Sequence, residues 1–285
     1  MKKYSILLAV ILLATLIVAQ DVSAQIPYSL LLPSVRAPRL SQGAKVSQVI
    51  GLSEVTIFYH RPGVKGRKIW GDVVKYNEPW RVGANEPTLI QFSDEVTIEG
   101  KKLPAGTYRL LMFPGEKEWS VVLNAEVKSW GTVYDAKYDT LRFAVKPESG
   151  PNEEWLSLSF EDLTPASAKI VMAWEKVRIA FKIEFNLLAK LQASVGTAGV
   201  LNQAARFAVD NKLYYKEAMG WVDRSIAIDK NAGNLRTKAE LLALDGKNAE
   251  ALASAEEALS LAKARNQQTM LPVLEKLITD LKAKK

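Results

Sequence analysis

The side chains best suited to chemistry lie in two neighbouring segments, YHRPGVKGRKIWG at residues 59–71 and PWRVGANEPT at residues 79–88. Arginine presents a planar fork that suits carboxylate or phosphate partners. Tryptophan rings can stack on a sugar or a guanidinium group. The prolines and glycines between them predict rigid, tightly turning loops. The candidate ligand-binding residues are therefore Arg61, Arg67, Trp70, Trp80, Arg81, Asn85 and Glu86.

The same residue types also suit a purely structural role. Buried arginine–carboxylate pairs can hold long loops onto a domain, and Trp70 and Trp80 can belong to its core. The residues themselves leave both interpretations open, a polar pocket with aromatic walls or an internal network.

The familiar catalytic patterns are missing from the sequence. With one histidine, His60, and no cysteine, the chain cannot build a usual zinc cluster, so we expect no metal site and no cofactor. It has no nucleophile elbow, phosphate loop or dinucleotide fingerprint. A Ser-His-Asp set would need His60, which we interpret as a structural or binding residue. The alternative is a glycan or ester hydrolase using Glu86, Asp94 or Glu95, and a glycosidase would need two carboxyl groups about 5–9 Å apart.

The N-terminus predicts export. Lysines at positions 2 and 3 precede an apolar run at residues 6–19, and Val-Ser-Ala ending at Ala24 resembles a cleavage site. We expect residues 1–24 to be removed as a signal peptide, which leaves a periplasmic or secreted protein without a stable membrane span. The absence of cysteine excludes both a lipoprotein anchor and disulfides.

Composition and charge narrow the class of protein. The 285 residues are 48% hydrophobic and 24% charged, which is ordinary for a soluble globular chain of one or two domains. The net charge of +7 is spread thinly along the sequence. Nucleic-acid binding would require a concentrated basic stripe, so we expect no nucleic-acid partner.

Hydrophobic periodicity predicts the fold class as mainly β plus α. Residues 25–44 contain three prolines and are expected to form an extended lead-in. Residues 45–186 contain many short runs with alternating apolar and polar positions, clearest at 177–185, separated by turn signals. Such a strand buries one face and leaves the other in water. We predict an antiparallel, jelly-roll-like β-sandwich.

Residues 187–285 are expected to be helical. The block starting at Tyr215 matches the block starting at Asn248, an offset of 33 residues, with turn signals at 231–234 and Gly246. Helix, turn and helix at this period resemble a degenerate tetratricopeptide repeat. Such repeats present concave docking surfaces, so a protein partner on this tail is one expectation.

Three motifs in order resemble one known family. They are RPGVKGRKIWG, WRVGANEPT and, at residues 100–114, GKKLPAGTYRLLMFP. Together they are similar to domain-of-unknown-function family 2911, whose members are exported bacterial proteins with a helical tail and no established activity. The resemblance implies an exported protein and carries over no catalytic residue. Its signature positions are Arg61, Pro62, Gly66, Arg67, Trp80, Arg81, Gly83, Ala84 and Asn85.

The sequence thus favours an exported protein that binds, without catalysis, a small polar or glycan-like ligand or a protein partner. A hydrolase and a purely structural envelope protein are the alternatives. A set of coordinates discriminates among them, because an open arginine cleft favours binding, two facing carboxylates favour hydrolysis and a filled core favours a structural role.

Overall fold

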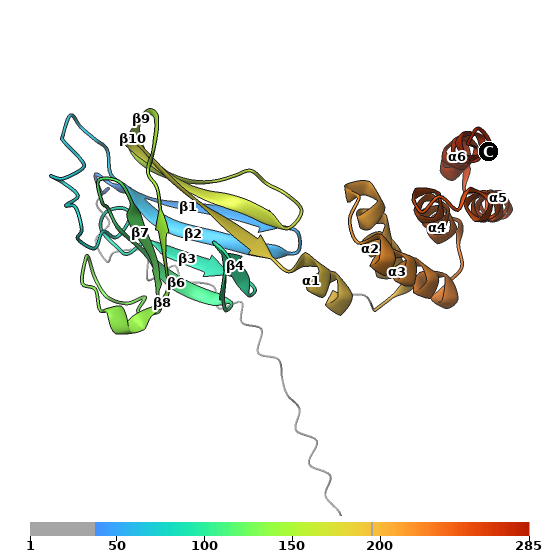
Figure 1. The fold of residues 1–285 in the computed structure, drawn as a ribbon, viewed down its shortest axis with the longest axis horizontal. Coiled ribbons are helices and arrows are strands. Elements are labelled where there is room, and N and C mark those ends of the chain that lie inside the picture. Colours follow the sequence, from blue (N-terminus) through green and yellow to red (C-terminus); the bar gives the residue numbers. More distant parts are fainter. Residues whose placement is uncertain (1–37, 195, 285) are drawn as a thin grey trace, which may run out of the picture.

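The computed structural model describes residues 38–194 and 196–284. The predicted signal peptide and most of the lead-in lie outside the described residues. Two antiparallel sheets are followed by helices, which confirms the predicted fold class (Figure 1). None of the described helices is both long and apolar enough to cross a membrane.

The larger sheet has six strands and runs mostly as a meander. Its order is β1-β2-β3-β6-β7-β8, and neighbouring strands are antiparallel. The strands are β1 (Gln42–Ile50), β2 (Ser53–Arg61), β3 (Leu89–Phe92), β6 (Gly106–Phe113), β7 (Trp119–Asn124) and β8 (Asp139–Val145). The chain leaves this sheet between β3 and β6 to form two strands of the smaller sheet, and again after β8 to form the other two.

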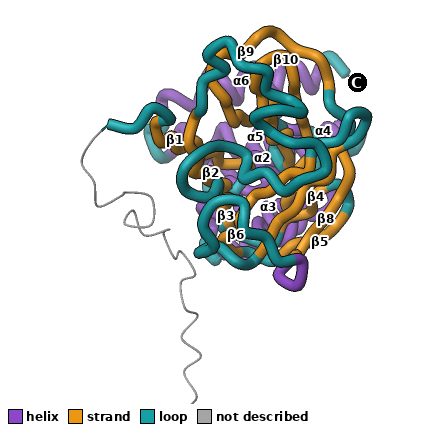
Figure 2. The backbone as a smooth tube through the Cα atoms, turned by 90° about the vertical axis from the view of Figure 1, so that its left-hand side faces the viewer, coloured by secondary structure: helices purple, strands orange, loops and turns teal. Residues whose placement is uncertain are grey.

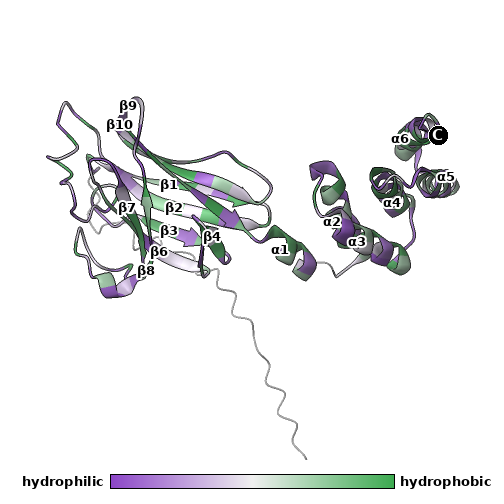
Figure 3. Ribbon diagram, in the orientation of Figure 1, coloured by the Kyte–Doolittle hydropathy of each residue, from purple (hydrophilic) through white to green (hydrophobic). Residues whose placement is uncertain are grey.

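The smaller sheet has four strands in the order β5-β4-β10-β9. Its members are β4 (Val96–Ile98), β5 (Lys101–Leu103), β9 (Glu148–Glu161) and β10 (Ser167–Phe185). The predicted alternation at residues 177–185 is confirmed, because Ile179, Phe181, Ile183 and Phe185 are all buried in the core between the sheets. Figure 2 shows the sandwich from its end, and Figure 3 shows hydrophobic and hydrophilic residues interleaved along the strands.

Several strands of the larger sheet depart from the expectation of a wet face, among them β2, β6 and β7. In β2, Val55, Ile57 and Tyr59 belong to the main core, as alternation predicts. The intervening Phe58 and His60 are also buried, at 7% and 6% exposure. They lie on the face of the six-stranded sheet that is turned away from the smaller sheet, here called the outer face. Something must therefore cover this face, and the covering elements form the site described below.

The helical tail follows β10 almost directly. It comprises α1 (Leu187–Ser194), α2 (Ala198–Asn211), α3 (Tyr215–Ile228), α4 (Ala232–Leu244), α5 (Asn248–Ala264) and α6 (Leu271–Lys282). Helix α1 leaves the end of β10, and the other helices extend beyond it (Figure 1). Small residues let α2 and α3 pack closely, with Ala204, Ala205 and Ala208 facing Ala218 and Val222 in one cluster.

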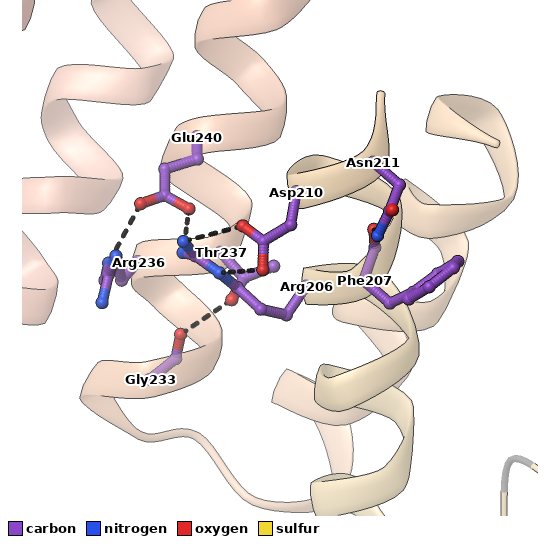
Figure 4. Close-up of polar contacts among 8 residues, drawn as sticks. All are labelled: Arg206, Phe207, Asp210, Asn211, Gly233, Arg236, Thr237 and Glu240. Carbon is purple, nitrogen blue, oxygen red and sulfur yellow. Dashed lines mark hydrogen bonds and ion pairs between the residues drawn. The ribbon is translucent and has the colours of Figure 1, made fainter. Parts of the chain in front are cut away.

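A capping box marks the start of α4, and ion pairs join α4 to α2. Asn231 and Asn234 form a reciprocal capping box at the start of α4, where the sequence predicts a turn. Arg206 of α2 ion-pairs with Asp210 on its own helix and with Glu240 of α4, and Arg236 holds the other oxygen of Glu240 at 3.0 Å (Figure 4). This network joins α2 to α4, and its charges neutralise one another.

Candidate functional site

The first part of the long connection between β2 and β3 is held by arginines that bind backbone carbonyls. Arg61 Nε donates to the Leu156 carbonyl of β9 at 2.8 Å. Arg67 donates to the carbonyls of Gly63 at 2.6 Å and Val64 at 3.0 Å, within its own turn. Arg61 therefore acts as a strut that fastens the start of the connection to the smaller sheet, whereas the exposed Arg67 only shapes its own turn.

The two candidate tryptophans belong to an aromatic cluster. The rings of Trp70 and Trp80 pack on each other and on Trp119 and Trp174, with centroid separations from 4.9 to 6.2 Å. Trp80 is buried at 6% exposure and stacks on Trp174 with an interplanar angle of 13°. Such a cluster contributes to the core by area and by ring geometry.

The second part of the connection forms a compact excursion, residues 81–88, here called the arginine loop. Trp80 exchanges two backbone hydrogen bonds with Met112 of β6, and the Thr88 carbonyl accepts from Leu110 of the same strand at 2.9 Å. The chain therefore leaves the path of β3 after Trp80 and returns to it at Thr88. The Thr88 hydroxyl closes the loop by donating to the Val82 carbonyl at 2.8 Å.

The backbone of the arginine loop is strained. Val82 and Asn85 have positive φ angles, of 52° and 57°. A positive φ is uncommon for any residue other than glycine and is least expected for a β-branched residue such as Val82. At Gly83 a Cβ would lie 2.8 Å from the carbonyl oxygen of His60, so only glycine allows the loop to pass this close to β2. Strained residues persist only where their surroundings over-determine them, and they cluster at functional sites.

On one side, the arginine loop meets β2 and the residues just before β1 through a buried carboxylate. One oxygen of Glu86 accepts from Arg39 at 2.9 Å and lies 3.1 Å from His60 Nε2. Glu86 and His60 are each 6% exposed. The imidazole packs over Gly43 of β1, where a Cβ would come within 3.3 Å of Nε2. Burial lowers the pKa of His60 against the opposing charge of Glu86, so His60 is neutral at pH 7 and Nε2 donates to the carboxylate.

On the other side, the loop brings Arg81 to Arg109 of β6. Arg109 is 1% exposed and donates to two backbone carbonyls, those of Gly131 and, at 2.6 Å, Val133. Its Nε has no hydrogen-bond partner within the described part of the chain. A Cβ on Gly131 would lie 3.6 Å from Arg81 Nη1, so the two guanidinium groups surround the same glycine. Arg81 itself donates to the Asn85 carbonyl at 2.9 Å.

Burial, and for Arg109 the proximity of Arg81, shifts the pKa values of these two cations. Burial lowers the pKa of Arg81. Burial, and after it the neighbouring charge of Arg81, lowers the pKa of Arg109, while Glu126 opposes the shift. Arginine nevertheless stays charged in proteins. No carboxylate of residues 38–194 or 196–284 forms an ion pair with either guanidinium group.

Residues 125–138, here called the covering segment, lie over the outer face. Val127 packs on Phe58 and Leu89. The Tyr134 ring packs on Phe113, with ring centroids 5.1 Å apart, and its hydroxyl donates to Asp139 at 2.6 Å. Together with Arg109, which binds the middle of the segment, these contacts fasten it to the sheet at three places. The covering segment therefore explains why this face of the sheet is buried.

The structure thus divides the candidate residues between two faces of one sheet. His60 points to the outer face while Arg61 turns toward the smaller sheet, and Trp80 turns to the core while Arg81 joins the outer face. Consecutive strand residues alternate, which separates them. Arg81, Asn85 and Glu86 come together on the outer face, and Asn85 also donates to the Ser41 carbonyl at 2.9 Å. Arg61, Arg67, Trp70 and Trp80 serve the other side.

Sequence reasoning missed Arg39 and Arg109. The sequence did contain a signal for Arg109, because a charged residue interrupts the otherwise apolar strand sequence TYRLLMF. Arg39 lies in the lead-in next to Pro38 and offers no such signal.

The carboxylates proposed for hydrolysis do not face one another. Glu86 precedes β3, whereas Asp94 and Glu95 follow it, and four strand residues span about 13 Å. Asp94 pairs with Lys190 at 2.6 Å and Glu95 with Lys102 at 2.8 Å. A paired-carboxylate glycosidase needs about 5–9.5 Å between its carboxyl groups. Within the described residues, no group of three or more acidic, histidine or cysteine side chains could hold a metal ion.

Comparison with known proteins gives one match. A family model described as "Protein of unknown function (DUF2911)" matches residues 41–183. No curated protein and no solved structure matches the chain. The matched range includes the whole arginine loop, the covering segment and both sheets apart from the final residues of β10.

Proposed function

Because the chain belongs to the DUF2911 family of proteins of unknown function, which supplies no activity, we propose from the geometry of the site that it is a binding protein for a small anionic ligand. The observation that carries the proposal is the pair of adjacent guanidinium groups, Arg81 and Arg109. Both are drawn out of bulk water, and no carboxylate in the described part of the chain forms an ion pair with either, although the charge of Glu126 acts on Arg109.

Charge accounting on the outer face supports an anion. Glu86 is already shared between His60 and Arg39 at 3.1 and 2.9 Å. Backbone carbonyls satisfy hydrogen bonds of Arg81 and Arg109 but do not cancel their charge. Placing like charges together in a partly dry environment is unfavourable unless an opposite charge joins them. A bound carboxylate, sulfate or phosphate would supply that charge and accept from the arginine forks.

The two arginines contribute differently. Arg109 is fully buried, holds the covering segment and acts on a ligand through its charge. Arg81 is only partly buried, and among the described residues its guanidinium donates to a single carbonyl, that of Asn85. Its remaining donors are available for direct contact with an anion. Asn85 is fixed by Ser41 and holds Arg81 in place, so the strained loop presents a preorganised donor.

A thermal-shift screen of the mature protein tests the proposal. The panel contains phosphate, sulfate, acetate and citrate at constant ionic strength, with glucose as a neutral control. A ligand at 100 times its Kd stabilises by about 2.7 kcal/mol, or about 5–11 °C in Tm for a domain of this size.

The matched variants are Arg81→Ala and Arg67→Ala. Arg67 is an exposed arginine that also binds carbonyls but lies outside the site. Arg81→Ala should abolish the anion-dependent shift, and Arg67→Ala should retain it. If no anion raises Tm, or if both variants respond like the parent protein, the anion site does not exist and a structural role for the outer face is the better explanation.

We also propose that the protein acts outside the cytoplasm. The basic start, the apolar run and the small residues ending at Ala24 support cleavage there. The intact mass of the protein recovered from the periplasm or medium should correspond to a chain beginning at Gln25. A membrane-bound form that retains Met1 would contradict export with cleavage.

A further inference from the structure

Next to the guanidinium pair, the covering segment exposes apolar side chains. Trp130 is 59% exposed and Val133 is 66% exposed. The two residues close one turn, in which the Val133 N–H donates to the Trp130 carbonyl at 3.3 Å. Single exposed apolar residues are ordinary on protein surfaces, but here two of them flank one turn over buried cations.

This turn is bound directly to the proposed anion site. Trp130 immediately precedes Gly131, whose carbonyl accepts from Arg109 and on which a Cβ would lie 3.6 Å from Arg81 Nη1. The Val133 carbonyl accepts from the same Arg109 at 2.6 Å. The backbone of the turn is therefore fixed by the cations, while its indole stays outside. Trp130 packs on no aromatic ring of the described residues, in contrast to the four-tryptophan cluster of the core.

We propose that the ligand is a carboxylate carried on a six-membered ring, with the carboxylate on Arg81 and one face of the ring against Trp130. This inference rests on the anion site proposed above and names the class of ligand. A flat indole face favours a flat or chair-shaped ring, because contact area is gained with little loss of side-chain freedom. Acidic sugars and benzoate-type aromatic acids share this chemistry, and the experiment separates them.

The arrangement also defines what the site disfavours. A carboxylate without a ring would contact Arg81 but leave the indole uncovered. A neutral sugar would cover the indole but leave the two guanidinium charges unpaired. The ring-bearing carboxylate is the smallest ligand that satisfies both features at once, and so it should bind more tightly than either fragment.

Isothermal titration calorimetry on the mature protein tests the inference with four probes, glucuronate, benzoate, acetate and glucose. Glucuronate or benzoate should bind more tightly than acetate, and glucose should not bind measurably. Trp130→Ala should weaken the ring-bearing acid about threefold to tenfold, the usual worth of an aromatic contact. Acetate binding should be unchanged in Trp130→Ala and lost in Arg81→Ala.

Trp155→Ala is the matched control, because Trp155 is also an exposed tryptophan, at 42%, but lies on β9 in the other sheet. It should leave all four affinities unchanged. A stronger response to glucuronate identifies a sugar acid and a stronger response to benzoate an aromatic acid. If acetate binds through Arg81 but Trp130→Ala leaves glucuronate and benzoate unaffected, the ring inference is wrong while the anion site stands. If no probe binds through Arg81, the anion site itself is refuted.

Discussion

Replacing Glu86 by alanine tests whether the outer face is organised as described. Glu86 is the buried carboxylate through which the arginine loop is fastened to Arg39, just before β1, and to His60 of β2. Its removal leaves His60 Nε2 without an acceptor inside the protein. The other ring nitrogen, Nδ1, already has no partner among the described residues. Arg39 would lose its ion pair but can turn toward solvent, because 30% of its side chain is exposed.

The expected loss of stability follows from how deeply each contact of Glu86 is buried. A hydrogen bond to a charged group contributes about 1.5–3 kcal/mol, and this applies to the buried contact with His60. The ion pair with Arg39 adds less than about 1 kcal/mol, because solvent reaches its arginine, which is 30% exposed, and screens it. We expect the free energy of unfolding to fall by about 2–4 kcal/mol. For a unit of this size that corresponds to about 4–16 °C in Tm.

Urea unfolding followed by circular dichroism measures the loss. The control is Glu95→Ala, since within residues 38–194 and 196–284 Glu95 pairs only with Lys102, and the two side chains are 58% and 75% exposed. This control should leave the urea midpoint unchanged. Arg39→Ala should cost less than Glu86→Ala, because it leaves the His60 contact in place. A Glu86→Ala midpoint equal to that of Glu95→Ala would refute the argument that Glu86 anchors the loop.

Further predictions follow from the same contacts. Stability should decrease as pH falls from 7 through about 6.5. Burial lowers the pKa of His60, so in this range the unfolded chain binds more protons than the folded one. His60→Gln, which removes the only histidine of the sequence, should make the urea midpoint nearly independent of pH between pH 5 and 7. Arg61→Ala should lower the free energy of unfolding, measured in urea, by about 1–3 kcal/mol, because the Leu156 carbonyl loses its charged donor. A loss no larger than that of Arg67→Ala, at an exposed arginine, would contradict the role of Arg61 as a strut. A chain of residues 33–186 should keep a β-rich circular dichroism spectrum with a lower Tm, because it loses the apolar contacts of Leu187; an unfolded product would show that the tail and the sandwich form one obligate core.

Local pattern predicted most strands as short runs of alternating apolar and polar positions between turn signals, although β2, β6 and β7 bury both of their faces. The prediction failed where the pairing between strands, rather than the local pattern, determines where a strand begins or ends. Strand β1 begins at Gln42, inside the expected lead-in of residues 25–44, since the weak pattern QGAKVSQVI is held by its pairing with β2. Strand β10 runs through residues 167–185 without a break at Glu175. A register shift against β9 absorbs that residue, whose φ is 54°.

The candidate site shows the same limit more sharply. The sequence places arginines and tryptophans in one linear cluster and suggests one location. Alternation sends His60 and Arg61 to opposite faces, but which face is the core depends on where the smaller sheet packs, and that sheet is built largely from residues 148–185. Arg109 joins Arg81 only because β3 pairs with β6. Long-range pairing of this kind leaves no trace in a local motif.

The division of the motifs bears on what a family signature means. Among the signature residues, Arg61, Arg67 and Trp80 bind carbonyls or fill the core, and such positions preserve a fold whatever the ligand. Arg81 and Asn85 belong to a strained loop that brings a positive charge beside another one, an arrangement that costs stability. A loop kept only for folding would gain from a neutral residue at position 81. Arg81→Met, which keeps the length of the side chain and removes the charge, should therefore stabilise the unliganded protein and abolish its response to anions. Unfolding in urea without ligand measures the first effect, and destabilisation there would show that Arg81 serves the fold.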